Sequence, residues 1–316
     1  MRPALVGLIA LTLGSTAAAP AAESDLHARV EHHYVDSDGV KIHYVTLGEG
    51  PPVLMIHGFP DFWYTWRHQM EGLAEHFQVI AMDQRAYNRS GQPEGVESYA
   101  MRSLIGDVVA VVRDLGHQKA TIVGHDWGGA VAWQVALNVP AITERLIILN
   151  LPHPNGLTRE LATNEEQQSN SGYARAFQSG SASDPDIFFG GPMTPQTLSG
   201  WVSDPAAREF YVEAFERSYF DGMLNYYKRN YPRPGSTSTS PPQPLPKVEM
   251  PVLMFHGLDD TALHSDGLNN TWDWLDQDLT LVTVPGVGHF VQQDAAELVT
   301  STMKWWLLAR NPPSGD

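Results

Sequence analysis

The stretch from Thr121 to Gly129 reads Thr-Ile-Val-Gly-His-Asp-Trp-Gly-Gly, and it decides the fold. Its first three residues are β-branched and apolar, which favours a strand. The Gly-x-Asp-x-Gly that follows is typical of a nucleophile elbow, a sharp strand-to-helix turn that holds one reactive side chain out of a sheet. Gly124 and Gly128 suit such a turn because neighbouring backbone comes close to it. The sequence therefore predicts a strand, a tight turn that presents Asp126, and a helix.

The reactive position holds an aspartate where an esterase or lipase would have a serine. A serine that attacked a saturated carbon would form an ether, which the enzyme could not cleave. A carboxylate forms an ester instead, and water can hydrolyse that ester in a second step. Asp126 therefore indicates a substrate with an electrophilic sp³ carbon, either an epoxide or an alkyl halide.

Composition limits the possible classes of protein. The chain has 316 residues, of which 42% are hydrophobic, and this suits one large α/β domain with an inserted subdomain. The formal net charge of −16 disfavours binding to nucleic acid or to anionic membrane surfaces. The absence of cysteine excludes disulfides, thiolate metal sites and cysteine nucleophiles. Histidines do not occur in pairs at metal-ligand spacing, so we expect no metal.

The N-terminus has the pattern of a signal peptide, which we place at residues 1–21. Arg2 gives a short positive region, Ala4 to Leu13 is apolar, and small residues follow from Ser15 to Ala22. The apolar run is shorter than the roughly 20 residues that span a bilayer. These features predict export to the periplasm or secretion, without stable insertion in a membrane.

Strand and helix patterns alternate in two parts of the chain, at 22–154 and 248–316. Parallel strands need crossover helices, so this alternation predicts a mostly parallel, doubly wound sheet. The segment between them, 155–247, is polar and interrupted by turn residues, and it ends in a Pro-rich return loop from Pro232 to Pro246. We interpret it as an inserted helical cap. The expected strands are Val40–Val45, 53–56, 77–82, the elbow strand, 146–149, 252–255 and 279–284, and the expected helices lie near 61–73, 104–115, 130–137, 203 onward and 298–307.

Two residues outside the elbow complete a catalytic constellation. His289 lies in a Gly-rich loop just after an expected strand, and it is the candidate base. Asp260 follows another strand and is the candidate orienting acid, although its neighbour Asp259 is an alternative. The chain order of nucleophile, acid and base is that of the α/β-hydrolase architecture. All three follow strand ends, at the carboxyl edge where open α/β sheets build their sites.

Several motifs of the chain resemble those of a known family. The motifs Gly-His-Asp-Trp-Gly-Gly at the elbow, His57-Gly58-Phe59-Pro60 and the late Gly-x-Gly-His are similar to those of the α/β-hydrolase-fold epoxide hydrolases. The resemblance implies a cis peptide bond before Pro60, and an oxyanion hole made by the backbone N–H groups of Phe59 and Trp127. The segment 83–90 is similar to the family's Arg-Gly-Tyr-Gly-x-Ser loop, but Ala86 and Asn88 replace glycines there, so the loop backbone is expected to differ.

Members of that family carry two cap tyrosines that bind the epoxide oxygen. The resemblance places them at Tyr173 and Tyr227, with Tyr211, Tyr219, Tyr226 and Tyr231 as nearby alternatives. The chemistry suits this role, because an opening epoxide leaves an alkoxide that needs a proton. A tyrosine, a neutral donor with a pKa of about 10, can hydrogen-bond the ring oxygen and then protonate it.

The expected reaction converts a small hydrophobic epoxide and water to a vicinal diol, and it needs no cofactor. We expect an apolar pocket whose substrate-binding residues include Trp63, Phe188, Phe189 and Phe290.

Two alternatives share these motifs. A haloalkane or haloacid dehalogenase would use the same nucleophile, but the paired tyrosines disfavour it. An exported, non-catalytic effector could also keep the fold. The sequence leaves open the natural epoxide, the stereochemistry and the oligomeric state.

Overall fold

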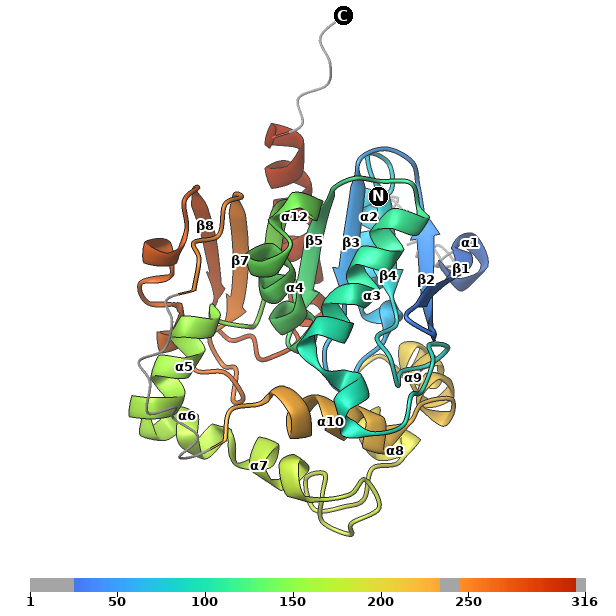
Figure 1. Cartoon of the computed structure of the whole chain (residues 1–316), viewed down its shortest axis with the longest axis vertical. Helices are drawn as coiled ribbons and strands as arrows, with labels where there is room; N and C mark the ends of the chain where they lie inside the picture. The colour runs from blue at the N-terminus through green and yellow to red at the C-terminus, as the bar shows by residue number, and fades with distance from the viewer. Residues whose placement is uncertain (1–25, 234–244, 311–316) are drawn as a thin grey trace, which may run out of the picture.

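The computed structural model describes residues 26–233 and 245–310 of the chain (Figure 1). The predicted signal peptide and most of the Pro-rich return loop lie outside these ranges, so both remain predictions.

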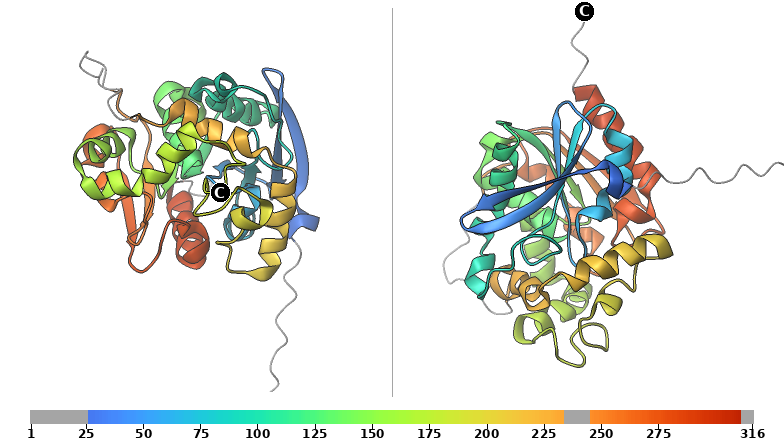
Figure 2. Two further views of the ribbon diagram at one scale, coloured as in Figure 1. Left: turned by 90° about the horizontal axis from the view of Figure 1, so that it is seen from below. Right: turned by 90° about the vertical axis from the view of Figure 1, so that its right-hand side faces the viewer.

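Eight strands of the described chain form one sheet, in the order β1-β2-β4-β3-β5-β6-β7-β8. The first two strands pair antiparallel with their neighbours, and the others are parallel, which confirms the predicted mostly parallel sheet. The right-hand view of Figure 2 shows the β1–β2 hairpin crossing the outer edge of the twisted sheet. The strands are β1 (Glu31–Ser37), β2 (Val40–Leu47), β3 (Pro52–Ile56), β4 (Gln78–Met82), β5 (Ala120–His125), β6 (Thr143–Leu149), β7 (Val252–Gly257) and β8 (Leu279–Val284).

Helices cover both faces of this sheet. The helices α3 (Met101–Asp114) and α4 (Trp127–Asn138) lie on one face, while α2 (Arg67–Leu73) and α12 (Ala296–Arg310) lie on the other (Figure 1). Strands buried on both faces are continuous apolar runs, as in β5 and β7, whose residues are all buried. The remaining core elements are short: α1 (Leu26–Arg29), α11 (Val291–Asp294), and the 3₁₀ turns η1 (Trp63–Trp66), η2 (Val96–Tyr99), η3 (Pro140–Ile142), η4 (Ser265–Leu268) and η5 (Thr271–Trp274).

A helical cap lies across the end of the sheet to which the parallel strands point, as Figure 1 and the left view of Figure 2 show. Its helix α9 begins as the sequence predicts, because the Asp204 side chain accepts the N–H of Ala206 and Pro205 occupies the first turn. The cap helices are α5 (Pro154–Thr163), α6 (Glu165–Asn170), α7 (Gly172–Ser179), α8 (Pro195–Leu198), α9 (Pro205–Glu216) and α10 (Phe220–Asn230).

Two local expectations differ from the structure. The sequence favours Asp61 as the cap of the helix expected near 61–73, because such a residue often precedes a helix, but Asp61 does not cap the helix that follows it. Its carboxylate accepts the N–H of Phe62 and the hydroxyl of Tyr211 in the cap, and η1 and α2 have no side-chain cap. Strand β1 was not anticipated, because it is a mostly exposed edge strand whose polar residues give no apolar alternation.

The described ranges contain neither a membrane-spanning helix nor a metal-binding cluster. None of the helices there is both long and apolar enough to cross a bilayer. Among the same residues, His, Asp and Glu side chains do not gather in a group of three that could hold a metal ion.

Candidate active site

The elbow between β5 and α4 holds Asp126 in a strained backbone conformation, with φ of +51°. The two predicted glycines are required there. A Cβ on Gly124 would lie 2.2 Å from the carbonyl oxygen of Gly128, and one on Gly128 would lie 2.1 Å from that of Ile56. The elbow therefore forms because these positions bear no side chain.

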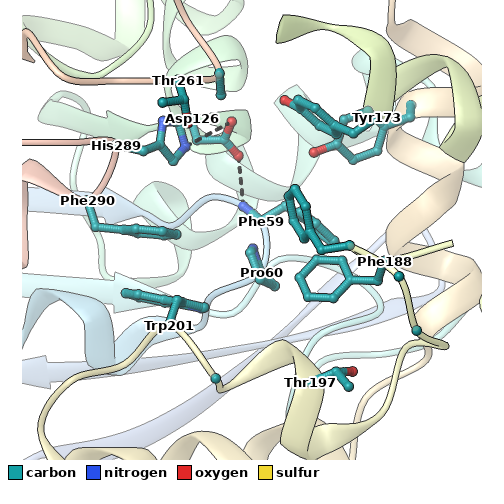
Figure 3. A pocket seen from close by; sticks show the side chains of 16 residues that line it. Phe59, Pro60, Asp126, Tyr173, Phe188, Thr197, Trp201, Thr261, His289 and Phe290 are labelled. Atoms are coloured by element: carbon teal, nitrogen blue, oxygen red, sulfur yellow. Dashed lines mark hydrogen bonds and ion pairs between the residues drawn. The ribbon is translucent and has the colours of Figure 1, made fainter. Parts of the chain in front are cut away.

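The base and the acid meet Asp126 at the carboxyl edge of the sheet. His289 places Nε2 3.6 Å from Oδ2 of Asp126 (Figure 3). Its Nδ1 lies 2.8 Å from Oδ2 of Asp260. The alternative acid, Asp259, is exposed, and its backbone N–H donates to the carbonyl oxygen of Val287 in the turn. The geometry therefore favours Asp260 over Asp259 as the partner of His289. The structure thus brings together the predicted nucleophile, base and acid.

Asp260 is held by more than its histidine. Its Oδ1 accepts the backbone N–H groups of Ala262 and Leu263, at 2.8 and 3.1 Å. Its Oδ2 also accepts the side-chain amide of Asn150, at 2.7 Å. Asn150 is buried, with φ of +42°, and sequence reasoning missed it. In the sequence, Asn150 could have been recognised as a candidate by its position directly after the apolar run of β6.

The charges of the triad reinforce one another. Burial opposes ionisation of both aspartates, yet the hydrogen bonds and charge of His289 hold the pKa values of Asp126 and Asp260 below their usual range. Burial also opposes protonation of His289, but the two carboxylates raise its pKa to about 10. At neutral pH the resting site therefore holds an imidazolium between two carboxylates.

Asp126 also contacts the loop after β3, which contains the cis peptide. The backbone N–H of Phe59 donates to Oδ1 of Asp126 at 2.8 Å, and the peptide bond from Phe59 to Pro60 is cis, as the resemblance implied. Trp127 is the first residue of α4, where backbone N–H groups have no partner within the helix. The role of its amide in an oxyanion hole stays a prediction.

Both predicted cap tyrosines reach the cavity above Asp126. Tyr173 on α7 and Tyr227 on α10 line it together, with ring centroids 6.0 Å apart. Burial raises the pKa of each phenol well above 10, and the charge of Asp126 raises it further. Both side chains are therefore neutral hydrogen-bond donors at neutral pH.

The alternative tyrosines have other partners. Tyr226 donates to the carbonyl oxygen of Arg85, at 2.9 Å, and Tyr231 donates to Oγ of Ser171, at 2.9 Å. Tyr211 donates to Asp61, and Tyr219 begins α10 at the edge of the cap. None of these four lines the larger cavity with Asp126, so geometry favours Tyr173 and Tyr227 as the donors.

The cavity has a volume of about 550 Å³ and a largely aromatic wall. Phe188 and Phe290 line it as predicted (Figure 3). Phe189 also borders it, although it is 83% exposed. A second cavity of about 160 Å³ shares Asp126, Tyr173 and Tyr227 with the first, so the reactive groups stand between two spaces.

The prediction for Trp63 was wrong. Its ring does not line the cavity; it is buried beneath, against His27 and Phe62. A different tryptophan, Trp201 of the cap, lies in the cavity wall with its ring stacked on Phe290 at 3.6 Å between centroids (Figure 3). Sequence gave no signal for Trp201 beyond its being a lone aromatic residue in a polar stretch.

The loop at 83–90 keeps the conformation that glycines would favour. Ala86 has φ of +75° and Asn88 has φ of +44°, both in the left-handed region. Both residues thus adopt a conformation that glycine would tolerate, and the expectation that this loop differs from those of related proteins stays a prediction. Other contacts must stabilise a conformation that is unfavourable for alanine and asparagine.

The fold and the site together define a class of protein. A family model described as the alpha/beta hydrolase fold matches residues 51–296. The chain is an α/β hydrolase in which the predicted nucleophile Asp126, the predicted base His289 and two phenols of the cap line one cavity.

Comparison with known proteins narrows the class. Epoxide hydrolase 1 of Caenorhabditis elegans is 31% identical over 88% of this chain and 70% of its own length. The crystal structure of a variant of an epoxide hydrolase from Bacillus megaterium superposes with a TM-score of 0.78 at 30% identity, covering 87% of this chain and 99% of that one. A structure of an epoxide hydrolase from hot-environment metagenomes gives a TM-score of 0.78 at 34% identity, covering 88% and 98%. The chain belongs to the epoxide hydrolase family.

Proposed function

We propose that this enzyme opens a hydrophobic epoxide in two steps, through a covalent ester on Asp126. The observation that carries the proposal is the placing of an ionised carboxylate and two neutral phenols on opposite sides of one apolar cavity. A carboxylate is the nucleophile and a phenol is the acid that ring opening needs.

In the first step, Tyr173 and Tyr227 hydrogen-bond the epoxide oxygen while Asp126 attacks a ring carbon from the other side. The C–O bond of the ring breaks, a hydroxyalkyl ester forms, and one phenol gives its proton to the departing oxygen. A neutral phenol suits this role, because it binds the neutral epoxide without placing a charge in the apolar wall before the ring opens. Donation leaves a phenolate, which must regain a proton.

Loss of the charge on Asp126 then prepares the second step. That charge is one of the two that hold a proton on His289, so the pKa of the imidazole falls once the ester forms. The released proton restores the phenol, and neutral His289, oriented by Asp260, takes a proton from water. The hydroxide attacks the ester carbonyl, and the tetrahedral intermediate collapses to the carboxylate of Asp126 and a vicinal diol.

We expect the backbone amides of Phe59 and Trp127 to stabilise the oxyanion of that intermediate. Phe59 already donates to the carboxylate oxygen that would carry the negative charge. An oxyanion-hole donor of this kind contributes about 10² to 10³ in rate.

The two-step mechanism is tested by trapping the ester. In a His289→Gln variant mixed with styrene oxide, we expect the ester to form and to persist, because no base remains to activate water. Mass spectrometry should then find the peptide that contains Asp126 heavier by one styrene oxide. The matched control is the double variant with Asp126→Ala, which has no nucleophile at this position and should carry no adduct. An unmodified His289→Gln enzyme that also forms no diol would contradict the mechanism.

We also propose that residues 1–21 are removed on export to the periplasm or on secretion. Support comes from the sequence alone: Arg2, the apolar run and the small residues that follow it. N-terminal sequencing of the enzyme from the exported fraction should begin near residue 22. Intact protein confined to the cytoplasmic fraction would contradict export.

A further inference from the structure

Asn88 occupies a position where the related loop has a glycine, and it adopts the left-handed backbone that a glycine would adopt without cost. Its side chain is buried, with 4% of the residue exposed. A residue in an unfavourable conformation persists only where surrounding contacts stabilise it. The contacts of Asn88 are therefore the place to look for its role.

The amide of Asn88 joins the core to the cap. Its Nδ2 donates to Oδ2 of Asp83 at 2.8 Å, and its Oδ1 accepts Nε of Arg217 at 3.0 Å. Asp83 follows β4 directly and is fully buried, with Oδ1 accepting the N–H of Trp63 and Oδ2 bonded to His43. Arg217 ends α9, at the turn that leads into α10. A glycine at position 88 could make neither side-chain bond.

Backbone contacts attach the same turn to the same loop. The N–H of Asn88 donates to Oγ of Ser218 at 2.8 Å, and the N–H of Tyr219 donates to the carbonyl oxygen of Ala86 at 2.8 Å. Gly222, in the first turn of α10, allows close approach, because a Cβ there would lie 2.7 Å from that of Ala86. The start of α10 therefore rests directly on this loop.

Helix α10 carries Tyr227 two turns further on, about 12 Å along the helix axis from Tyr219. A small rotation of the helix start would therefore displace the phenol that faces Asp126. Its neighbour Tyr226 points elsewhere and donates to Arg85 of the same loop. The loop at 83–90 therefore contacts α10 at two places, at the start of the helix and next to Tyr227.

We propose that Asn88 is a positioning residue for Tyr227: its side chain ties the turn before α10 to the fixed carboxylate of Asp83, and this sets where the phenol stands above Asp126. The inference rests on the proposed role of Tyr227 as a proton donor. Asn88 touches neither the substrate cavity nor the nucleophile, so it acts only through the helix.

The test separates the two chemical steps. In an Asn88→Gly variant the backbone keeps its conformation without strain, and only the side-chain bonds are lost. Rapid-quench measurements with styrene oxide should find ester formation slowed about fivefold or more, which is less than the roughly 10²-fold cost of a full 1 Å misplacement. Ester hydrolysis, which depends on His289, should keep its rate.

Ala86→Gly is the matched control, since it relieves a left-handed residue of the same loop and retains the carbonyl that binds Tyr219. It should leave both rates unchanged. Arg217→Met removes the same contact from its other partner. The side chain of Arg217 is 43% exposed, so this variant should fold. It should slow ester formation as Asn88→Gly does. Combining Asn88→Gly with Arg217→Met should slow ester formation little further, because both variants break the same connection between residues 88 and 217.

Unchanged ester formation in Asn88→Gly and Arg217→Met would overturn the inference. So would an equal loss in both steps, or a matching loss in Ala86→Gly, because either would indicate general disturbance of the loop. The proposed function is judged separately, by Tyr227→Phe. If that variant slows ester formation while Asn88→Gly does not, only the positioning role fails.

Discussion

The carboxyl edge of the sheet and the cap border one cavity, but they carry different kinds of groups. The sheet edge holds two carboxylates and an imidazolium, fixed by backbone amides and by Asn150. The cap supplies phenols whose pKa values are raised, so that they stay neutral. Charged groups need many fixed partners when they are buried, and the ends of parallel strands provide them. Neutral donors need fewer, so a separately inserted helical layer can carry them.

This contrast predicts that the first step depends on the cap and the second on the sheet edge. Replacing both phenols, Tyr173→Phe with Tyr227→Phe, should slow ester formation by about 10²- to 10⁴-fold, because the leaving oxygen then lacks its acid. The aromatic rings remain, so the cavity keeps its shape. Rapid-quench kinetics with styrene oxide would measure the loss.

Each single variant should lose less than the pair, because one phenol remains to hydrogen-bond the oxygen. Hydrolysis of any ester that does form should be unaffected. A double variant with unchanged ester formation would remove the cap from the mechanism and leave it a structural cover.

A smaller effect concerns the charge of the sheet edge. The pKa of His289 is raised from 6.5 to about 10 in the folded protein. The bound proton therefore stabilises the fold fully below pH 6.5, and this contribution is lost as the pH rises through the folded value of about 10. Asp126→Asn removes one of the two charges that hold the proton, so it should lower the pKa of His289.

Two measurements check this prediction. Ring-nitrogen NMR should show that the imidazolium of His289 loses its proton at a lower pH in Asp126→Asn than in the wild type. Denaturant unfolding across the same pH range should find that the alkaline loss of stability is smaller in the variant and is complete at a lower pH, because only the folded pKa changes. Identical titration of His289 in both proteins would show that Asp126 does not control its proton.

Some of the site was predictable because the local sequence specifies the local geometry. The elbow around Asp126 follows from two glycines whose positions tolerate no side chain. The base and the acid follow from their place after strands of a parallel sheet, since those strand ends share one edge. The sequence favoured Asp260 but left Asp259 as an alternative, because adjacent residues differ mainly in the direction that the turn gives them.

The pocket wall was harder to predict. Trp63 lies in the aromatic run Phe62-Trp63-Tyr64 and Trp201 is a lone aromatic residue, yet the first is buried in the core and the second stacks on Phe290 in the cavity. Which aromatic residue meets the cavity depends on how the cap helices pack on the core, and no short pattern encodes that packing.

The sequence by itself indicated all of the sheet except β1, together with the predicted nucleophile Asp126 and the predicted base His289, because strand patterning and turn glycines act over a few residues. The tertiary structure alone decided the shape of the cavity and the partners of Asn88, Asn150 and Tyr211. Those contacts join segments that lie far apart in the chain, and only the folded arrangement brings them within hydrogen-bonding distance.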